Sequence, residues 1–388
     1  MFNFSTLPFF DNHTHRIKSE NHEVTPLELA VSWMHGWGDI NPPEGPCGRS
    51  ANEENCSPEY AEHVKHMGVV KTVVNYMAQH FHCEPTLEAV TAQRNKRTSV
   101  DAAGYNKELY ESEHIFAEMV DDGAPFGDNA LHCFPTHILR LFQMDPCFKK
   151  LLGECSTYTE LKQRFDAAIR AKLLEGFIGV KCHVLEILTQ HPHIVEDAEA
   201  EQLYSAAKAQ DVHAFEEVYL AIFCHMLKLT QELKFHVHIH TGCTGNPGNG
   251  LVFHCDPIHL CPLLGDNRFY ASRIIFLHGC YPDIRHAALL THSYPNVWVD
   301  LSWTCPWISL NFSQCLEETL AIAPHDKIMF GTGQHHFAEM AWAASKISKT
   351  ALAHVFEGAV RKNLISIPQA QESAEMLLYK NAKRLYGI

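Results

Sequence analysis

Short apolar runs recur along the chain, and longer stretches with apolar residues three or four positions apart separate most of them. Continuous runs rich in β-branched and aromatic residues are typical of buried parallel strands, whereas the three-to-four spacing indicates one face of a helix. On this basis we predict eight strands, at Leu7–Phe10, Val69–Met77, His137–Met144, Phe177–His183, Phe235–His240, Ile274–His278, Val297–Leu301 and Lys327–Gly331.

Helical spacing fills most of the chain between these strands. Strands that alternate with helices predict a parallel sheet, and eight such units favour a closed (β/α)8 TIM-like barrel over an open sheet. No Gly-rich phosphate-binding pattern opens any predicted helix. We therefore expect one barrel domain over residues 1–388 with extra C-terminal helices, and helices at 24–35, 84–97, 105–121, 157–174, 198–231 (with a break near Gln210), 257–265, 283–293, 313–322 and beyond 331.

One segment fits neither pattern. Residues 36–58 follow the first strand and its helix, and they are rich in Gly, Pro, Asn, Glu and Ser. Long irregular insertions of this kind are either surface loops or lids over a site. Trp33 and Trp37 offer an anchor, so we interpret 36–58 as a lid or loop insertion.

Composition limits the class of protein. The chain of 388 residues is 46% hydrophobic and 20% charged, with a net charge of −14, which is typical of a globular protein and disfavours nucleic-acid binding. No apolar run reaches membrane-spanning length, and the N-terminus lacks signal-peptide features. The 14 Cys form no CxxC pair, which favours reduced thiols. We expect a cytoplasmic protein that acts on a small molecule without nucleic-acid or membrane partners, and a homo-oligomer remains open.

Ionisable side chains follow several predicted strands. His13 and His15 follow the first strand, and Lys181, His240 and His278 lie near the ends of the fourth, fifth and sixth. In a barrel the carboxyl ends of all strands line one mouth, so these side chains are expected to meet there. Each of these residues alone could be an ordinary core or surface residue, since the chain holds 28 His. An interpretation in which none of them binds metal therefore stays open. Their shared position predicts a metal site.

Arg140 lies in the middle of the third predicted strand. An arginine inside a strand is usually an edge or exposed residue. In a closed barrel it would instead face a polar interior, where its guanidinium could bind the carboxylate of an anionic substrate.

Motifs spread over nearly the whole chain resemble the amidohydrolase superfamily, in particular the amidohydrolase-related branch, which includes the domain fused to some glutamine synthetases. They occur in the order typical of that family. The matching segments are Asp11–His15, Gly179–Lys181, His240–Gly242, Leu277–Gly279 with Tyr281–Pro282, Tyr294–Val297 with Asp300, Phe330–Thr332, and Asn381–Gly387.

The resemblance implies roles for these residues. His13, His15 and His240 would bind a divalent metal, and His278 would bind a second metal or orient the water or the substrate. Lys181 stands where some members carry a bridging carbamylated lysine. Imidazole ligands suit zinc, with manganese or iron as alternatives. The implied reaction is attack by a metal-activated water on an amide, ester or lactone of a small polar or anionic substrate, and decarboxylation is a non-hydrolytic alternative.

The sequence departs from the family after the last strand. Gly333 stands where the family carries an Asp that binds the metal and acts as general base, and loss of such a base costs about 10²–10⁴ in rate. His335 and His336 follow and are expected to keep a place near the substrate. Asp11 and Asp300 are expected to accept hydrogen bonds from ligand histidines rather than bind metal. Two hypotheses remain: an active metal-dependent hydrolase, and an inactive member that binds metal or ligand.

Overall fold

The computed structural model describes residues 2–17, 23–34, 62–121, 134–243, 255–303, 307–335 and 337–388. Eight parallel strands form one sheet in which each strand pairs with the next in sequence order. The predicted (β/α)8 architecture is therefore confirmed. The strands are β1 (Phe9–Thr14), β2 (Ile115–Asp121), β3 (His137–Gln143), β4 (Phe177–Cys182), β5 (His236–His240), β6 (Arg273–Leu277), β7 (Val297–Asp300) and β8 (Ile328–Met329).

Backbone hydrogen bonds bring the last strand back to the first. The Asn12 N–H donates to the carbonyl of Phe330 (3.0 Å), and the Gly333 N–H donates to the carbonyl of His13 (2.7 Å). The Asp11 carboxylate reinforces this seam, because it accepts a hydrogen bond from the Thr332 N–H (2.8 Å) and another from the Thr332 hydroxyl. The seam fixes the position of His13 and His15 at the rim.

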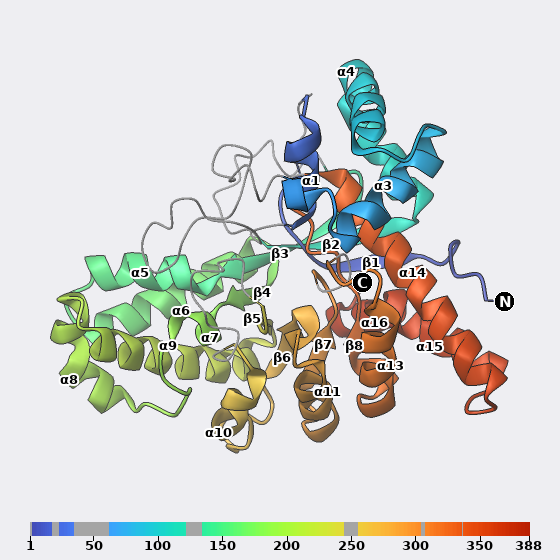
Figure 1. Cartoon of the computed structure of the whole chain (residues 1–388). Coiled ribbons are helices and arrows are strands. Elements are labelled where there is room, and N and C mark those ends of the chain that lie inside the picture. The colour runs from blue at the N-terminus through green and yellow to red at the C-terminus, as the bar shows by residue number, and fades with distance from the viewer. Residues whose placement is uncertain are drawn as a thin grey trace.

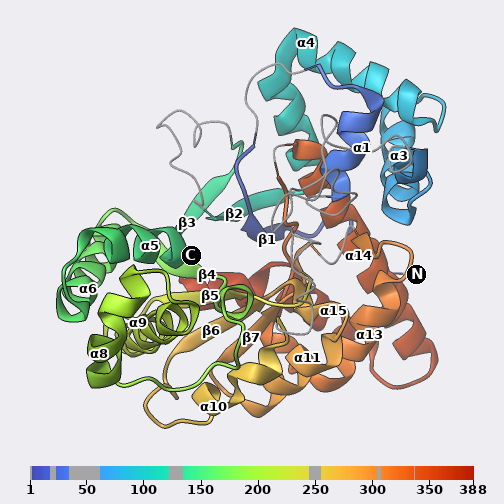
Figure 2. The same cartoon turned by 60° about the vertical axis from the view of Figure 1, so that its left-hand side comes forward.

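Helices cover the outside of the barrel (Figures 1 and 2). Most predicted helices are confirmed, including the break at residues 209–211 and the extra C-terminal helices. They are α1 (Pro26–Met34), α3 (Gly68–Phe81), α4 (Leu87–Ser112), α5 (Met144–Glu154), α6 (Tyr158–Leu174), α7 (Val184–Ile187), α8 (Asp197–Lys208), α9 (Val212–Leu233), α10 (Cys261–Leu264), α11 (Ile284–Ser293), α13 (Phe312–Ile322), α14 (Ala338–Arg361), α15 (Ile367–Glu375) and α16 (Asn381–Tyr386).

The prediction for the second strand is wrong. Val69–Met77 lies in helix α3, whose buried residues include Val69, Val70, Val73, Val74 and Met77. Their spacing of three to four residues is that of a helix face, which the continuous run of apolar letters concealed. The true second strand is Ile115–Asp121, inside the predicted helix 105–121.

The connection between β1 and β2 carries an α-helical insertion. Helices α1, α3 and α4 pack together there, and both views show them gathered beyond β1 and β2 (Figures 1 and 2). The predicted lid at 36–58 lies outside the described residues. The helices nevertheless place the insertion next to the strands that carry His13, His15 and Asp121.

The floor of the barrel is closed by helix α16. The Tyr386 ring stacks on Phe10, with centroids 5.7 Å apart, and its hydroxyl donates to the Asn12 side-chain oxygen. The Asn381 side chain anchors the helix by donating to the carbonyls of His325 and Ile328, both at 2.8 Å. The C-terminal Asn381–Gly387 motif is thus part of the barrel.

No helix among the described residues is long and apolar enough to cross a membrane.

Candidate metal centre

The carboxyl ends of the strands bring six predicted site residues close together. The ring centroids of neighbouring histidines lie 3.6–5.0 Å apart in the order His335, His15, His13, His278 and His240. Lys181 and Asp121 link to the other end of this series. Lys181 Nζ lies 3.6 Å from Asp121 Oδ2, and the same oxygen lies 3.9 Å from His15 Nδ1. The barrel therefore gathers these six predicted residues at one rim, and it adds Asp121 from β2, which was not predicted.

Three of these side chains form the first ligand group, which consists of His13, His15 and Asp121. One ligand atom from each lies within 4.8 Å of the other two. His13 Nδ1 and Asp121 Oδ2 are buried and have no hydrogen-bond partner among the described residues. Buried polar atoms without hydrogen bonds are costly. Two imidazoles and a carboxylate are a donor set that binds zinc-like cations, so these residues fit such a group.

A second ligand group lies across the rim and consists of His183, Glu186 and His240. The Nε2 atom of His240 is 3.3 Å from Glu186 Oε1 and 2.7 Å from the carbonyl oxygen of Cys243. His183 follows β4, Glu186 lies on the short helix α7, and His240 ends β5. The predicted set of His13, His15 and His240 is thus divided between the two groups, and their shared ligation of one ion stays a prediction.

Lys181 and His278 lie between the two groups. Lys181 Nζ is 2.9 Å from His183 Nε2 on one side and 3.6 Å from Asp121 on the other. The rings of His13 and His240 flank His278 at 5.0 and 4.4 Å. His278 Nδ1 lies 3.0 Å from the Ser302 hydroxyl, which fixes the orientation of the ring.

Burial controls the charge of these imidazoles. Desolvation lowers the pKa of His13, His240 and His278 well below the ordinary value, and neighbouring imidazoles and Lys181 lower it further. All three rings are therefore neutral near pH 7, which is the form that binds metal ions.

Gly333 follows β8 at the position where the family carries its Asp, and Trp303 lies against the space that a side chain there would need. Gly333 has φ +64°, and a Cβ added there would lie only 2.8–3.0 Å from the Cβ, Cα and N atoms of Trp303. The Trp303 ring packs against His278 and His240, with centroids 4.9 and 5.6 Å away. Trp303 thus covers the side of the centre where the family Asp was expected.

Arg140 is the predicted site residue that the structure does not bring to the rim. Its neighbours Leu139 and Leu141 belong to the cluster inside the barrel, and alternate strand residues face opposite sides. The Arg140 guanidinium instead lies 4.0 Å from the centroid of the Phe177 ring. This position gives no support to carboxylate binding at the mouth. His336 lies outside the described residues.

The two predicted supporting carboxylates accept hydrogen bonds from backbone N–H groups and from neighbouring polar side chains, and none from a ligand histidine ring is found among the described residues. Asp11 accepts hydrogen bonds from the Thr332 and His13 N–H groups, and burial raises its pKa to about 7. Asp300 accepts hydrogen bonds from the side-chain amide of Asn12 (3.0 Å) and from the Ser302 N–H (2.9 Å). Burial raises the pKa of Asp300 to about 6. Both hold the strand ends in place.

Sequence reasoning missed Asp121, His183 and Glu186. Asp121 was missed because its strand was assigned to a helix, although Ile115, Ala117 and Met119 alternate towards it. His183 ends the fourth predicted strand, and Glu186 follows it by three residues. His183 shares a strand face with Lys181, but the pattern of strand ends alone does not show that His183 and Glu186 turn towards His240.

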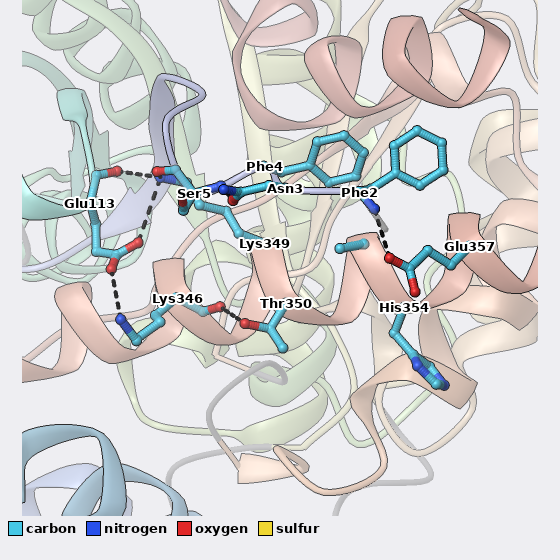
Figure 3. A pocket seen from close by; sticks show the side chains of 11 residues that line it. Phe2, Asn3, Phe4, Ser5, Glu113, Lys346, Lys349, Thr350, His354 and Glu357 are labelled. Atoms are coloured by element: carbon cyan, nitrogen blue, oxygen red, sulfur yellow. Dashed lines mark hydrogen bonds and ion pairs between the residues drawn. The ribbon is translucent and has the colours of Figure 1, made fainter. Parts of the chain in front are cut away.

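A separate hollow of about 390 Å³ lies away from the rim, between the N-terminal segment and α14 (Figure 3). The Phe2 N–H donates to Glu357 (2.6 Å), and the Lys349 ammonium donates to the carbonyls of Ser5 (3.1 Å) and Glu113 (2.5 Å). These contacts tie the N-terminal segment to the barrel, and neither ligand group lines this hollow.

Two sequence comparisons match this chain to known proteins. The family model described as "Amidohydrolase" matches residues 159–388. Protein fluG of Emericella nidulans is 33% identical over 162 residues, which are 42% of this chain and 18% of that protein. The chain therefore spans well under two thirds of the curated relative that it matches.

Solved structures share the fold over the whole chain. A protein from Lactobacillus casei, provisionally named a metal-dependent hydrolase, has a TM-score of 0.81 and 16% identity over 100% of this chain and 98% of its own. Uronate isomerase from Thermotoga maritima has a TM-score of 0.67 and 14% identity over 98% and 95%. Glucuronate isomerase from Caulobacter crescentus has a TM-score of 0.65 and 16% identity over 99% and 92%.

Proposed function

The chain belongs to the amidohydrolase family, and from this membership we propose that it is a metal-dependent hydrolase of small polar or anionic substrates. The observation that carries the proposal is the first ligand group, in which buried His13 Nδ1 and Asp121 Oδ2 lack hydrogen-bond partners among the described residues. Zinc is the preferred cation, because neutral imidazoles and one carboxylate are borderline ligands, and manganese or iron are alternatives.

A divalent cation held there would polarise an amide, ester or lactone carbonyl and lower the pKa of a water molecule. The chain's own residues would do the rest. The Ser302 hydroxyl lies 3.0 Å from His278 Nδ1, so Nε2 would be the ring nitrogen left to exchange a proton with the substrate. Lys181 Nζ, 3.6 Å from Asp121, would orient that carboxylate or an anionic substrate. His335, stacked on His15 at 3.6 Å, would line the substrate space.

The second candidate is a protein that binds metal or ligand without turnover. It is favoured by Gly333, which offers no carboxylate, and by Trp303, which fills the adjacent space. The two candidates differ in one measurable respect, because both predict bound metal and only the first predicts turnover.

The test combines metal analysis with metal removal. Protein purified without chelator would be analysed for metals and assayed on small esters, lactones and amides, with decarboxylation and uronate isomerisation as further arms. If the chain is a metal-dependent hydrolase, chelator should abolish hydrolysis, and added zinc or manganese should restore it. The His13→Asn variant should show no hydrolysis. Bound metal without turnover of any substrate would favour the binding protein. Hydrolysis that survives both chelator and His13→Asn would reject the metal-dependent mechanism.

A further inference from the structure

A basic hollow of about 490 Å³ lies at the floor of the barrel, at the opposite end of the strands from the candidate metal centre. It lies where β4, β5 and β6 begin, against the end of α16. Among the described residues that line it, Lys234, Arg273 and Arg384 are basic and none is Asp or Glu. This contrasts with the net charge of −14 of the whole chain. The hollow has the size of a pocket for a small molecule, and its charge favours an anion.

Arg273 is the central basic group of this hollow. It begins β6, where Ile275 and Leu277 alternate with it and belong to the cluster inside the barrel, so its side chain starts on the inner face of the sheet. Its Nη1 lies 3.4 Å from His236 Nε2, and no carboxylate forms an ion pair with it in the described part of the chain. A guanidinium has five N–H donors in a planar fork that matches phosphate and carboxylate groups. Most of these donors are therefore available to a bound anion.

His236 supports Arg273 from inside the barrel. Because a guanidinium can only donate, His236 Nε2 is the accepting nitrogen, and the proton of the neutral ring lies on Nδ1. Burial, followed by the charge of Arg273, lowers the pKa of His236 to about 4, whereas the nearby carbonyls of Ile178 and Leu385 oppose this shift. The ring is 5% exposed, and its Nδ1 completes no hydrogen bond with a described residue. A neutral imidazole thus holds the guanidinium without cancelling its positive charge.

The other two basic residues flank the hollow. Lys234 follows α9 with φ 59° and forms no ion pair with any described residue. A positive charge at the end of a helix is favourable by itself, which is an alternative reason for Lys234 but not for Arg273 at the start of a strand. Arg384 lies 3.4 Å from Asp326 Oδ2, so its charge is partly balanced. We therefore expect Arg273 to contribute most to anion binding and Lys234 to contribute less.

We propose that this hollow binds a small molecule that carries two or more negative charges on phosphate or carboxylate groups, with Arg273 as its main contact. The site needs no metal, and it is separated from the candidate metal ligands by the length of the strands. It is a second binding site of the chain, distinct from the substrate space at the mouth. The proposal goes beyond the proposed function and does not depend on the reaction at the mouth.

The experiment is calorimetric titration of the full chain with phosphate, pyrophosphate and citrate. Chelator-treated protein is used, so that no anion binds through a metal ion at the mouth. We expect binding of pyrophosphate, citrate or both, and tighter binding of one over the other identifies phosphate or carboxylate as the preferred group. Arg273→Gln should weaken binding at least about tenfold, because a hydrogen bond to a charged group is worth about that factor or more.

Two further variants accompany Arg273→Gln. Lys234→Gln should weaken binding by a smaller factor. Arg285→Gln is the matched control, because it removes the same charge from an exposed arginine that pairs with Glu318 on the outside of the barrel. It should bind the anions as the natural protein does. Thermal unfolding verifies that each variant is folded.

Three results would overturn the proposal. The first is that the natural protein binds none of the three anions. The second is that Arg273→Gln binds them as tightly as the natural protein. The third is equal weakening by Arg273→Gln and Arg285→Gln, which would mean that only the net charge matters. None of these results would contradict the proposed function, because no residue at the mouth is changed.

Discussion

The mouth and the floor of the barrel both contain buried histidines, yet their neighbours differ. His240 at the mouth lies 3.3 Å from Glu186, in a rim that also holds Asp121 and Lys181. His236 and His238 point from the same strand face towards the floor, where they pack against Tyr386 with ring centroids 5.2 and 6.1 Å away. Three like-facing imidazoles on one strand therefore lie in two different environments. Under the proposed function, the nearby carboxylates rather than the histidines themselves distinguish a candidate ligand from a packing residue.

The largest expected effect comes from a ligand at the mouth. Asp121→Asn keeps the shape of the side chain but removes the negative charge beside His13 and His15. We expect cation affinity at the first ligand group to fall by more than about 100-fold, since even residues behind a ligand contribute about 10–100-fold. Calorimetric titration with zinc measures the change. His238→Gln at the floor is the control, and equal effects of the two changes would erase the distinction between mouth and floor.

The floor should contribute to the loss of stability in acid. Burial, followed by the charge of Arg273, lowers the pKa of His236 to about 4 from an ordinary value of 6.5. The unfolded chain binds a proton there between pH 6.5 and 4 while the folded chain does not, so stability falls as pH falls through that window. The full contribution is about 3 kcal/mol. Denaturant unfolding at several pH values should show a weaker dependence in His236→Gln, and an unchanged dependence would contradict this account.

Gly333→Asp tests whether the mouth tolerates the family carboxylate. The residue has φ +64°, and its Cβ would lie 2.8 Å from the Trp303 Cβ. A side chain there forces a left-handed backbone conformation and displaces Trp303, at a cost of about 1–3 kcal/mol. Thermal unfolding should show this loss, and Gly333→Ala should reproduce most of it. A stable Gly333→Asp protein that gains hydrolysis would instead mean that the natural chain lacks only the base.

The smallest expected change is at the floor. Tyr386→Phe removes the hydrogen bond to the Asn12 side-chain oxygen and should lower the free energy of unfolding by about 1–2 kcal/mol. Zinc stoichiometry should stay unchanged, because the hydroxyl reaches neither ligand group. Loss of metal in this variant would mean that the floor also positions the rim.

The sequence was sufficient to predict the barrel, because seven of its strands follow the predicted apolar runs and the helices between them have a regular period. It was insufficient in the insertion between β1 and β2. There the buried residues of α3 occur in adjacent pairs, with other apolar residues between them. Its sequence therefore resembles the continuous apolar run of a buried strand. That error also hid the strand that ends at Asp121.

The rim was only partly predictable for a related reason. His13, His15, Lys181, His240 and His278 follow strand ends, so barrel topology alone brings them together. Glu186 and Trp303 lie on the segments after strands, and their direction depends on local backbone angles such as the φ of +57° at Trp303. The sequence left both faces of its strand open for Arg140, because one residue of register decides which face a side chain occupies.

The most direct test of the central claim is anomalous diffraction at the zinc edge from crystals grown with zinc. The account predicts an anomalous peak about 2.0–2.2 Å from nitrogen atoms of His13 and His15 and from an Asp121 oxygen. A well-ordered rim with no peak within bonding distance of these three side chains would contradict it.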